Sequence, residues 1–440
     1  MRKNILYIHT HDSGRYLEPY GAPVKTPRIM GLAEEGTLFR NAYCAGPTCS
    51  PSRVGLLSGM SPHSSNMLGL AQRGFRMDDY GYHLSNFLKG NGYQTCLFGV
   101  QHEAPDSAMI GYDYVYEADC DESDFMGRDL GASGHAARYL KEYKEDKPFF
   151  LAVGLIHTHR AYPDDAEKHI NPNYVSPPFT VADTKENRRD IAAYMRSAQI
   201  ADDCVGVVLD ALKESGMEDD TIIIFTTDHG IAFPFMKCNG YDTGIGVSLI
   251  MKYKGNAAAG KVSDSLLSQI DIFPTLCDMV GLTKPDYLQG KSFVEVFENP
   301  EAKINDEIYS EVTYHAAYEP MRCIRTERYK LIRYYDFHDG HVPGNIDESS
   351  CKTLLIESGL LKKSRPREML FDLYLDPVER ENLIGNPDYK EIYTDLRMRL
   401  EDWMERTEDP LIKVSYRVPK PEGAFVNRLQ DLDPGCMISE

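Results

Sequence analysis

The sequence predicts an α/β protein whose mainly parallel sheet is sandwiched by helices, with a smaller C-terminal subdomain that contains an antiparallel sheet. Three observations predict this fold class. Short apolar, β-rich runs alternate with helical stretches over most of the chain. The alternation stops near the C-terminus, where shorter runs rich in Tyr and Arg begin. The length of 440 residues is enough for a large domain and a companion, which we place at residues 1–310 and 311–440.

Four runs have the length and composition of buried strands in a parallel sheet. They are Asn4 to Ile8, Thr95 to Gly99, Phe149 to Ile156 and Thr221 to Thr226. The clearest helix is predicted over Lys185 to Ser215, where apolar residues recur mostly at spacings of three and four and Gly216 supplies the stop. In the C-terminal region we expect a strand-like run over Arg328 to Tyr335, a helix over Tyr389 to Arg406 and a Pro-containing tail from Val418.

The charge and composition exclude several classes of function. The chain has 48 Lys and Arg against 67 Asp and Glu, and the net charge of −19 argues against nucleic acid and anionic membranes as partners. No run reaches the roughly 18 apolar residues of a membrane span. The N-terminus lacks the pattern of a signal peptide, so we expect a cytoplasmic protein unless a leader has been removed. The ten cysteines form no CxxC pair and are expected to be mostly buried small hydrophobes.

Polar side chains follow each of the four predicted strands. Because the carboxyl ends of parallel strands meet at one edge of a sheet, these side chains should gather there. Carboxylates and imidazoles together suit a divalent metal, and we name Asp12, Asp228 and His229 as ligands, with His11 as a fourth candidate. A zinc site made of His9, His11 and Asp12 alone is disfavoured, because Asp12 would point away from both histidines on an extended strand.

The most specific segment runs from Cys49 to Gly59 and reads Cys-Ser-Pro-Ser-Arg-Val-Gly-Leu-Leu-Ser-Gly. Pro51 suits the first turn of a helix that continues to Ser58. Cys49 then lies at the positive end of this helix, where backbone N–H groups favour an anion. Arg53, about one turn further on, adds a fixed positive charge. The segment therefore predicts an anion site beside a cysteine.

This segment resembles the signature of the formylglycine-dependent sulfatases of the alkaline-phosphatase superfamily, Cys-x-Pro-Ser-Arg followed by Leu-Thr-Gly, with Ser58 in place of the usual Thr. The resemblance extends over nearly the whole chain and implies an alkaline-phosphatase-like fold. Further segments that resemble the family are Thr26 to Tyr43, Asp220 to Gly230, Lys237 to Tyr241, Ser268 to Leu276, Leu370 to Pro377 and Glu381 to Leu383.

The resemblance implies a specific chemistry. In such enzymes a maturation enzyme oxidises the motif cysteine, here Cys49, to formylglycine, and a hydroxyl of the aldehyde hydrate attacks sulfur beside a divalent metal, most often Ca²⁺. By the same resemblance, the side chains of Arg53, His102, His159 and Lys237 would surround the sulfate oxygens. One of the two histidines would also protonate the leaving group.

Two positions depart from the family pattern. Most sulfatases have two adjacent acids after the first strand, whereas this chain has His11 and Asp12. The nitrogen donor of His11 makes Mn²⁺ or a similar ion an alternative to Ca²⁺. After the second strand the family often has Gly-Lys-x-His, whereas here Val100 stands in place of the lysine. Another cation must replace that lysine, or the rate is lower.

The expected substrate is a small or chain-end sulfated carbohydrate, of the glycosaminoglycan type. Several segments resemble the heparan N-sulfatase branch, which suggests an N-sulfoglucosamine. We expect His157 and His315 to contact this substrate, and Arg322 to do so at the pocket mouth unless it is a domain-interface residue. The alternatives are a phosphonate monoester or phosphodiester hydrolase on the same scaffold and a catalytically inactive sulfatase-like binding protein.

Overall fold

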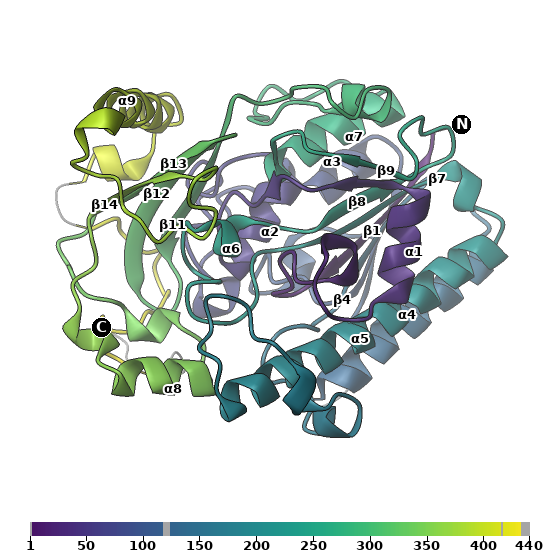
Figure 1. Ribbon diagram of the computed structural model, residues 1–440. Helices are drawn as coiled ribbons and strands as arrows, with labels where there is room; N and C mark the ends of the chain where they lie inside the picture. Colours follow the sequence, from purple (N-terminus) through teal and green to yellow (C-terminus); the bar gives the residue numbers. More distant parts are fainter. Residues whose placement is uncertain (1, 118–123, 415–416, 433–440) are drawn as a thin grey trace.

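The computed structural model describes residues 2–117, 124–414 and 417–432. Its main sheet has eight strands in the order β5-β4-β6-β1-β7-β8-β2-β9. Figure 1 labels β1, β4, β7, β8 and β9 of this sheet. All neighbouring pairs are parallel except the two pairs that β8 makes. The strands are β1 (Asn4–Thr10), β2 (Thr37–Phe39), β4 (Gln94–Gly99), β5 (Tyr114–Tyr116), β6 (Phe149–Gly154), β7 (Thr221–Thr227), β8 (Leu249–Lys252) and β9 (Lys261–Ser263).

The four predicted strands are confirmed as β1, β4, β6 and β7, which form the centre of this sheet. Two bounds differ by two residues: β1 continues to Thr10 rather than ending at Ile8, and β6 ends at Gly154 rather than at Ile156. The backbone N–H groups of Ile156 and His157 donate to the carboxylate of Asp129, at 2.7 and 3.0 Å, instead of continuing the strand ladder. The chain therefore leaves the sheet two residues earlier than its apolar pattern predicts.

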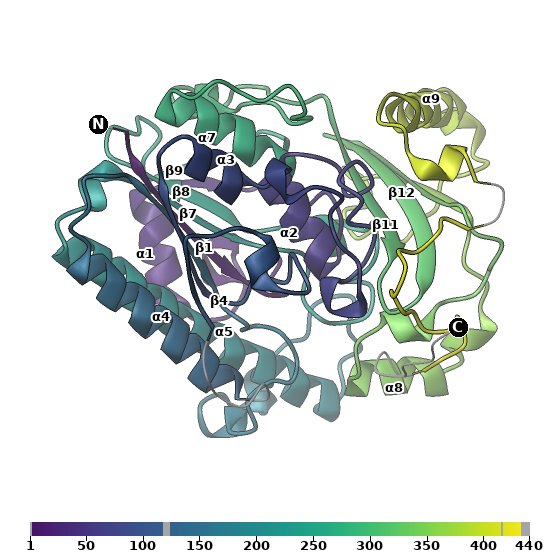
Figure 2. The same ribbon diagram turned by 180° about the vertical axis from the view of Figure 1, so that it is seen from behind.

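Helices cover both faces of the main sheet, as Figures 1 and 2 show. One face packs against α2 (Cys49–Ser58), α3 (Leu84–Gly90) and α7 (Ile272–Val280). The other packs against α1 (Pro27–Glu35), α4 (Phe125–Glu142) and α5 (Lys185–Glu214). Because both faces are covered, β6 and β7 are buried along their whole length. The predicted helix over Lys185 to Ser215 is confirmed as α5, and the predicted sandwich is the observed architecture.

The C-terminal part is built on a four-stranded antiparallel sheet, which confirms the expected subdomain. Its strands are β11 (Glu307–Tyr314), β12 (Tyr318–Thr326), β13 (Tyr329–Tyr334) and β14 (Glu368–Asp372), and its helices are α8 (Ser350–Glu357) and α9 (Lys390–Arg406). Met321 and Cys323 join the main core, whereas Ile324 packs in the cluster under α9. The two faces of β12 therefore have different neighbours, and the boundary expected after residue 310 falls within β11.

The remaining short elements are β3 (Ala42–Tyr43), β10 (Leu267–Ser268) and α6 (Asp242–Ile245), with β3 and β10 paired in parallel. Within the described ranges, no helix is both long and apolar enough to cross a membrane. The eight cysteines in these ranges are buried and unbonded, and the other two, Cys120 and Cys436, lie outside the described residues.

Candidate active site

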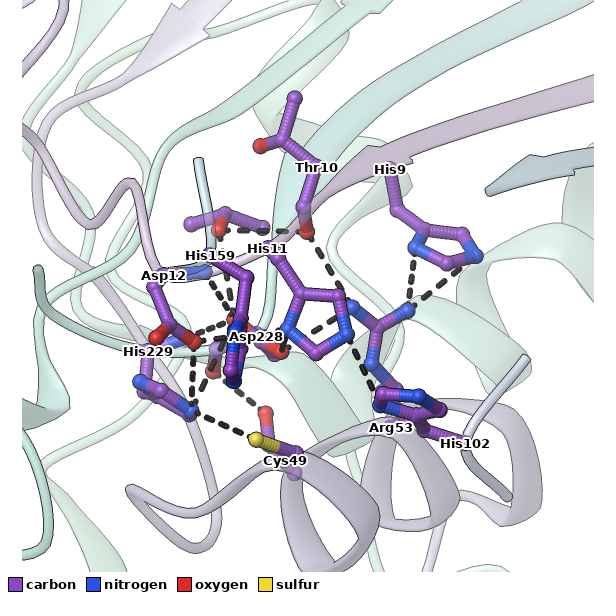
Figure 3. Close-up of polar contacts among 12 residues, drawn as sticks. His9, Thr10, His11, Asp12, Cys49, Arg53, His102, His159, Asp228 and His229 are labelled. Carbon is purple, nitrogen blue, oxygen red and sulfur yellow. Dashed lines mark hydrogen bonds and ion pairs between the residues drawn. The ribbon is translucent and has the colours of Figure 1, made fainter. Parts of the chain in front are cut away.

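The ends of the four central strands meet at one edge of the main sheet, as predicted. Thr10 on β1 is paired with Thr227 on β7, so the pairs that follow them, His11-Asp12 and Asp228-His229, lie next to each other. Thr158, after β6, donates through its hydroxyl to the carbonyls of His11 and Asp12 at 2.9 and 3.0 Å. Figure 3 shows the side chains that gather at this edge above the N-terminus of α2.

A potential metal site lies at this edge. Asp12, Cys49, Asp228 and His229 each direct one ligand atom into a space where these atoms lie within 4.8 Å of one another, and all four residues are buried. The N–H of Asp12 donates to Oδ1 of Asp228 at 2.8 Å. Asp12 has a positive φ of 41°, which is a strained backbone conformation for a residue other than glycine. Such strain in a residue other than glycine is typical of a functional site. The oxygen and nitrogen donors fit a divalent cation.

The imidazole of His229 is oriented for ligation. Its Nδ1 donates to the carbonyl of Gly230 at 3.0 Å, which leaves Nε2 free to face the carboxylates. Nε2 lies 3.3 Å from Oδ1 of Asp12 and 3.5 Å from Sγ of Cys49. Burial works against protonation, but Asp228 and Asp12 outweigh it and raise the pKa of His229 to about 9. The site therefore attracts positive charge.

Unlike the other three candidate ligands, His11 lies between Asp228 and His102. Its Nδ1 lies 3.1 Å from Oδ2 of Asp228, and its Nε2 lies 2.9 Å from Nδ1 of His102. It also belongs to a second group of potential ligands, with Asp12, Cys49 and His159. Burial and Arg53 oppose protonation, but Asp228 and hydrogen bonds with both carboxylates raise the pKa of His11 to about 10. His11 thus connects the carboxylates to His102.

Cys49 lies in the first turn of α2, after the N-cap residue Thr48. Its side chain is therefore at the positive end of the helix, as the sequence predicts. Burial opposes ionisation of the thiol, but Lys237 and hydrogen bonds from His102, His11 and His229 outweigh it and hold the pKa of Cys49 well below its ordinary value. These surroundings stabilise negative charge on the side chain at position 49.

The other polar residues of the signature segment hold this arrangement together. The hydroxyl of Ser50 accepts from the N–H of Ala71 at 2.9 Å, and that of Ser52 donates to the carbonyl of Asp228 at 2.5 Å. Arg53 donates to Oδ2 of Asp228 at 3.0 Å and also contacts His9. The Arg53 side chain is only 1% exposed and is not among the residues that line the cavity, so its contact is with Asp228.

Lys237 reaches the site from the loop that follows β7. Its Nζ donates to Oδ2 of Asp12 at 2.8 Å and lies 3.3 Å from Oδ2 of Asp347. Its carbonyl accepts from Nδ2 of Asn239 at 2.9 Å, which helps to fix the loop. Burial alone would lower the pKa of Lys237, but Asp12 and Asp347 keep it well above its ordinary value. The side chain is a buried permanent cation.

His102 is held by a tight loop after β4, in which Val100 provides no cation. Oε1 of Gln101 accepts from the N–H of Ala104 at 2.8 Å and also from that of Glu103, and its Nε2 donates to the carbonyl of Ala104 at 2.9 Å. These bonds support the positive φ of 53° at His102. Burial lowers the pKa of His102 to about 4, so its ring is neutral at physiological pH.

A cavity of about 420 Å³ opens beside Cys49. It is lined by Cys49, Leu70, Gln72, Arg73, His159, Lys237, His315, Ala316, Asp347 and Phe425. A second cavity of about 570 Å³ shares His159 and Asp347 with the first, so the space continues past these two residues. The first cavity therefore joins the cysteine and the buried lysine to side chains from the C-terminal part of the chain.

Two of the predicted substrate contacts do not line this cavity. Nδ1 of His157 pairs with the carboxylate of Asp129 on α4 at 2.6 Å, and His157 is not among the residues that line the cavity. Arg322 is fully buried between Glu311 and Asp409, because its position on β12 places it on the face that packs toward α9. The prediction that Arg322 reaches the pocket mouth is therefore wrong, because its guanidinium pairs with residues of the C-terminal part.

Asp347 and Gln101 are site residues that the sequence interpretation did not include. Asp347 follows a short helical turn, Pro343–Asn345, in a segment without a recognisable motif. It reaches the cavity only because the C-terminal part packs against the main domain. Gln101 stands next to Val100, where the departure from the family pattern could have drawn attention to it.

Comparisons with known proteins agree with this site. Residues 3–282 match the family model described as Sulfatase, and residues 229–342 match the model described as N-sulphoglucosamine sulphohydrolase, C-terminal. The chain is 27% identical to human N-sulphoglucosamine sulphohydrolase, over 99% of this chain and 94% of that protein. It is 28% identical to an ulvan-active sulfatase of Formosa agariphila, over 100% of this chain and 88% of that protein.

A similar fold occurs in a protein whose structure was solved in complex with its substrate, D-glucosamine-2-N,6-O-disulfate. The TM-score is 0.73 at 20% identity, with 94% of this chain and 100% of that chain covered. The family model covers well over half of the 440 residues, including the strand ends and the Cys49 to Gly59 segment. The chain therefore belongs to the Sulfatase family, as that segment predicts.

Proposed function

We propose that this protein hydrolyses a sulfate ester or a sulfamate of a sugar, with a nucleophile made from Cys49 and a divalent metal held by Asp12, Asp228 and His229. The observation that supports this most is the position of Cys49, within 4.8 Å of three potential metal ligands and in the wall of the cavity that also contains Lys237. Oxidation of Cys49 to formylglycine by a maturation enzyme would supply a hydrated aldehyde as the nucleophile, and the metal would supply Lewis-acid activation.

The residues of the chain would then have distinct tasks. Lys237 offers a fixed positive charge to the sulfo group from inside the cavity. His159 lines the same cavity and is accessible to the leaving group, so we assign the general acid to it. His102 hydrogen-bonds to His11 and would act on the metal site through that contact, while Arg53 keeps Asp228 in position.

The donor set bears on the identity of the metal. Two carboxylates and the imidazole of His229 converge on one space, and His11 offers a second nitrogen beside Asp228. Ca²⁺ prefers oxygen ligands in larger numbers, whereas Mn²⁺ accepts oxygen and nitrogen together. We therefore propose Mn²⁺ or a similar ion, with Ca²⁺ as the alternative that the family suggests.

The substrate would be a short or chain-end sulfated carbohydrate. The charge of −19 disfavours a long sulfated polymer, whereas a single sulfo group can enter a cavity that contains Lys237. The similarity to human N-sulphoglucosamine sulphohydrolase supports an N-sulfated glucosamine as the first compound to test.

Release of sulfate from defined compounds tests the proposal. The protein, coexpressed with a sulfatase-maturation enzyme, is assayed with N-sulfoglucosamine, glucosamine 6-O-sulfate, 4-nitrophenyl sulfate and a 4-nitrophenyl phosphonate monoester. We expect turnover of sulfo compounds, and none in the Cys49→Ala variant. Turnover of the phosphonate alone would overturn the proposal and favour the phosphonate hydrolase. Absence of all turnover despite complete conversion of Cys49 would favour the inactive binding protein.

A further inference from the structure

Asp347 places a carboxylate where a sulfatase pocket should favour positive charge. Its Oδ1 and Oδ2 lie 3.5 and 3.3 Å from Nζ of Lys237, and in the described part of the chain its carboxylate has no other hydrogen-bond or ion-pair partner. Lys237 already donates to Asp12 at the shorter distance of 2.8 Å. Asp347 is therefore a weakly held acceptor in the wall of the cavity beside Cys49.

A second residue indicates that this wall receives a polar ligand. His315 follows β11, is only 6% exposed and lines the same cavity, yet its Nδ1 has no hydrogen-bond partner. A buried polar atom without a partner is unfavourable, unless a ligand supplies the missing bond. Burial, with a further contribution from Lys237, lowers the pKa of His315 to about 4, so the ring is neutral and suits a sugar hydroxyl.

The charge of Asp347 restricts the chemistry of that ligand. A carboxylate next to Lys237 repels the sulfo group, so its presence weakens binding unless another part of the substrate compensates. A sugar hydroxyl offers one neutral donor, whereas an amine that becomes an ammonium offers a charge-assisted hydrogen bond of roughly twice the strength. An amino sugar compensates the repulsion better than a neutral sugar does.

We propose that Asp347 is a specificity-determining residue that selects substrates whose sulfo group is attached to the nitrogen of an amino sugar. The inference rests on the proposed function and deepens it. The general acid protonates the sulfamate nitrogen, which thereby gains positive charge beside Asp347 in the transition state. As the S–N bond breaks, its electron pair stays on nitrogen and the sulfo group passes to the nucleophile at position 49. The free amine then takes a second proton from water and pairs with Asp347 as an ammonium. An O-sulfate releases a neutral alcohol, which gains less from this carboxylate.

The location of Asp347 supports a role in specificity rather than in the shared chemistry. It lies outside both segments that the family models match, residues 3–282 and 229–342. It also shares the walls of the two cavities with His159, to which we assign protonation of the leaving group. The carboxylate thus shares a wall with the assigned general acid, and Lys237 lies between it and the potential metal ligand Asp12.

The test compares Asp347→Asn with Glu348→Gln, which neutralises the adjacent carboxylate that pairs with Lys352. We expect kcat/KM for N-sulfoglucosamine to fall about 10- to 100-fold in Asp347→Asn, the effect of one charge-assisted hydrogen bond. The value for 4-nitrophenyl sulfate should change less than about 3-fold, because this substrate has no amine. Glu348→Gln should behave as the wild type with both substrates.

A binding measurement separates charge recognition from a purely structural effect. Glucosamine should inhibit the wild type more strongly than N-acetylglucosamine, and this preference should disappear in Asp347→Asn. An equal loss of activity on both sulfo substrates in Asp347→Asn would overturn the inference, because Asp347 would then only position Lys237. A wild type that cleaves O-sulfates alone would overturn the inference but not the proposed function, whereas inactivity on every sulfo compound would overturn both.

Discussion

Two buried charge clusters of this protein differ in what lies beside them. The catalytic cluster contains the side chains of His11, Asp12, Arg53, Asp228, His229 and Lys237. The clamp cluster contains those of His63, Glu311, Arg322 and Asp409. Both include acids that approach one another closely, and both are almost inaccessible to solvent. Only the catalytic cluster lies beside an open cavity and a convergent set of potential ligands that includes a cysteine.

The clamp cluster is organised around one guanidinium. Arg322 donates to both carboxylate oxygens of Asp409 and forms an ion pair with Oε2 of Glu311, and its Nη1 donates to the carbonyls of Val312 and Met321. Glu311 also accepts from the backbone N–H and Nδ1 of His63, at 2.7 and 2.8 Å. All three guanidinium nitrogens have partners, and His63 connects the cluster to the main domain.

The difference shows why burial of charge alone does not identify a functional site. His63, Glu311 and Asp409 also form a group with ligand atoms close together, but Arg322 occupies the position that a cation would take. In the catalytic cluster the carboxylates share partners that also face Cys49 and the cavity. We therefore expect changes in the catalytic cluster to alter activity, and changes in the clamp cluster to alter stability.

Replacement of Cys49 should have the largest effect on activity. Cys49→Ser should lower kcat/KM for any sulfo substrate by about 10⁴-fold or more, because a single hydroxyl cannot form the hydrated aldehyde. The free energy of unfolding should change little, since Ser is of similar size. Steady-state kinetics with a thermal unfolding control measures both. Substantial turnover by the serine variant would show that the nucleophile lies elsewhere.

Removal of the metal should have the next largest effect. Asp228→Asn should lower kcat/KM about 10²- to 10³-fold, because it weakens both metal binding and the contact with Arg53. Dialysis against a chelator should lower the melting temperature of the wild type, and added Mn²⁺ at about 100 times its Kd should restore about 2.7 kcal/mol of stability. An unchanged melting temperature on metal addition would contradict a metal at Asp228.

Disruption of the clamp cluster should lower the stability of the protein and leave its activity nearly unchanged. Arg322→Ala leaves the buried carboxylates of Glu311 and Asp409 without their cation, which costs about 3–5 kcal/mol of stability. The kcat per folded molecule should stay near that of the wild type. Chemical denaturation measures the loss, and Arg138→Ala, at an exposed pair with Glu142, is the control that should change little. A selective rise in KM with intact stability would instead place Arg322 in substrate binding.

The pH dependence of stability should show a smaller effect of the clamp cluster. Burial tends to raise the pKa of Asp409, but Arg322 outweighs it and holds the pKa below its ordinary value. The stability that this carboxylate contributes is therefore present above its unfolded pKa of about 3.9 and is lost as the pH falls through the lower folded value. The difference in melting temperature between wild type and Asp409→Asn should shrink below about pH 4. A difference that stays constant down to pH 3 would contradict this assignment.

The sequence predicts the framework of the site better than its entrance. The residues that follow β1 and β7 could be assigned because parallel strands bring their carboxyl ends together, and Cys49 because Pro51 marks the start of its helix. Both inferences use interactions that are local or follow from one regular sheet. Arg322 could not be placed because its environment depends on which face of β12 meets α9.

Asp347 could not be predicted as a cavity residue for the same reason. Its segment has no periodic pattern, and its approach to Lys237 requires the C-terminal part to pack against a loop that is 110 residues away in the sequence. The role of Gln101 also depends on the turn that it closes around His102. Such contacts follow from tertiary packing rather than from local sequence preferences.

The relation between the chemical state of residue 49 and turnover tests the central claim most directly. Preparations with different amounts of maturation enzyme are compared by mass spectrometry of the peptide that contains Cys49 and by sulfate release from N-sulfoglucosamine and 4-nitrophenyl sulfate. We predict that specific activity rises in proportion to the fraction of aldehyde and is zero when only the thiol is present. Activity that does not depend on this fraction would contradict a nucleophile made from Cys49.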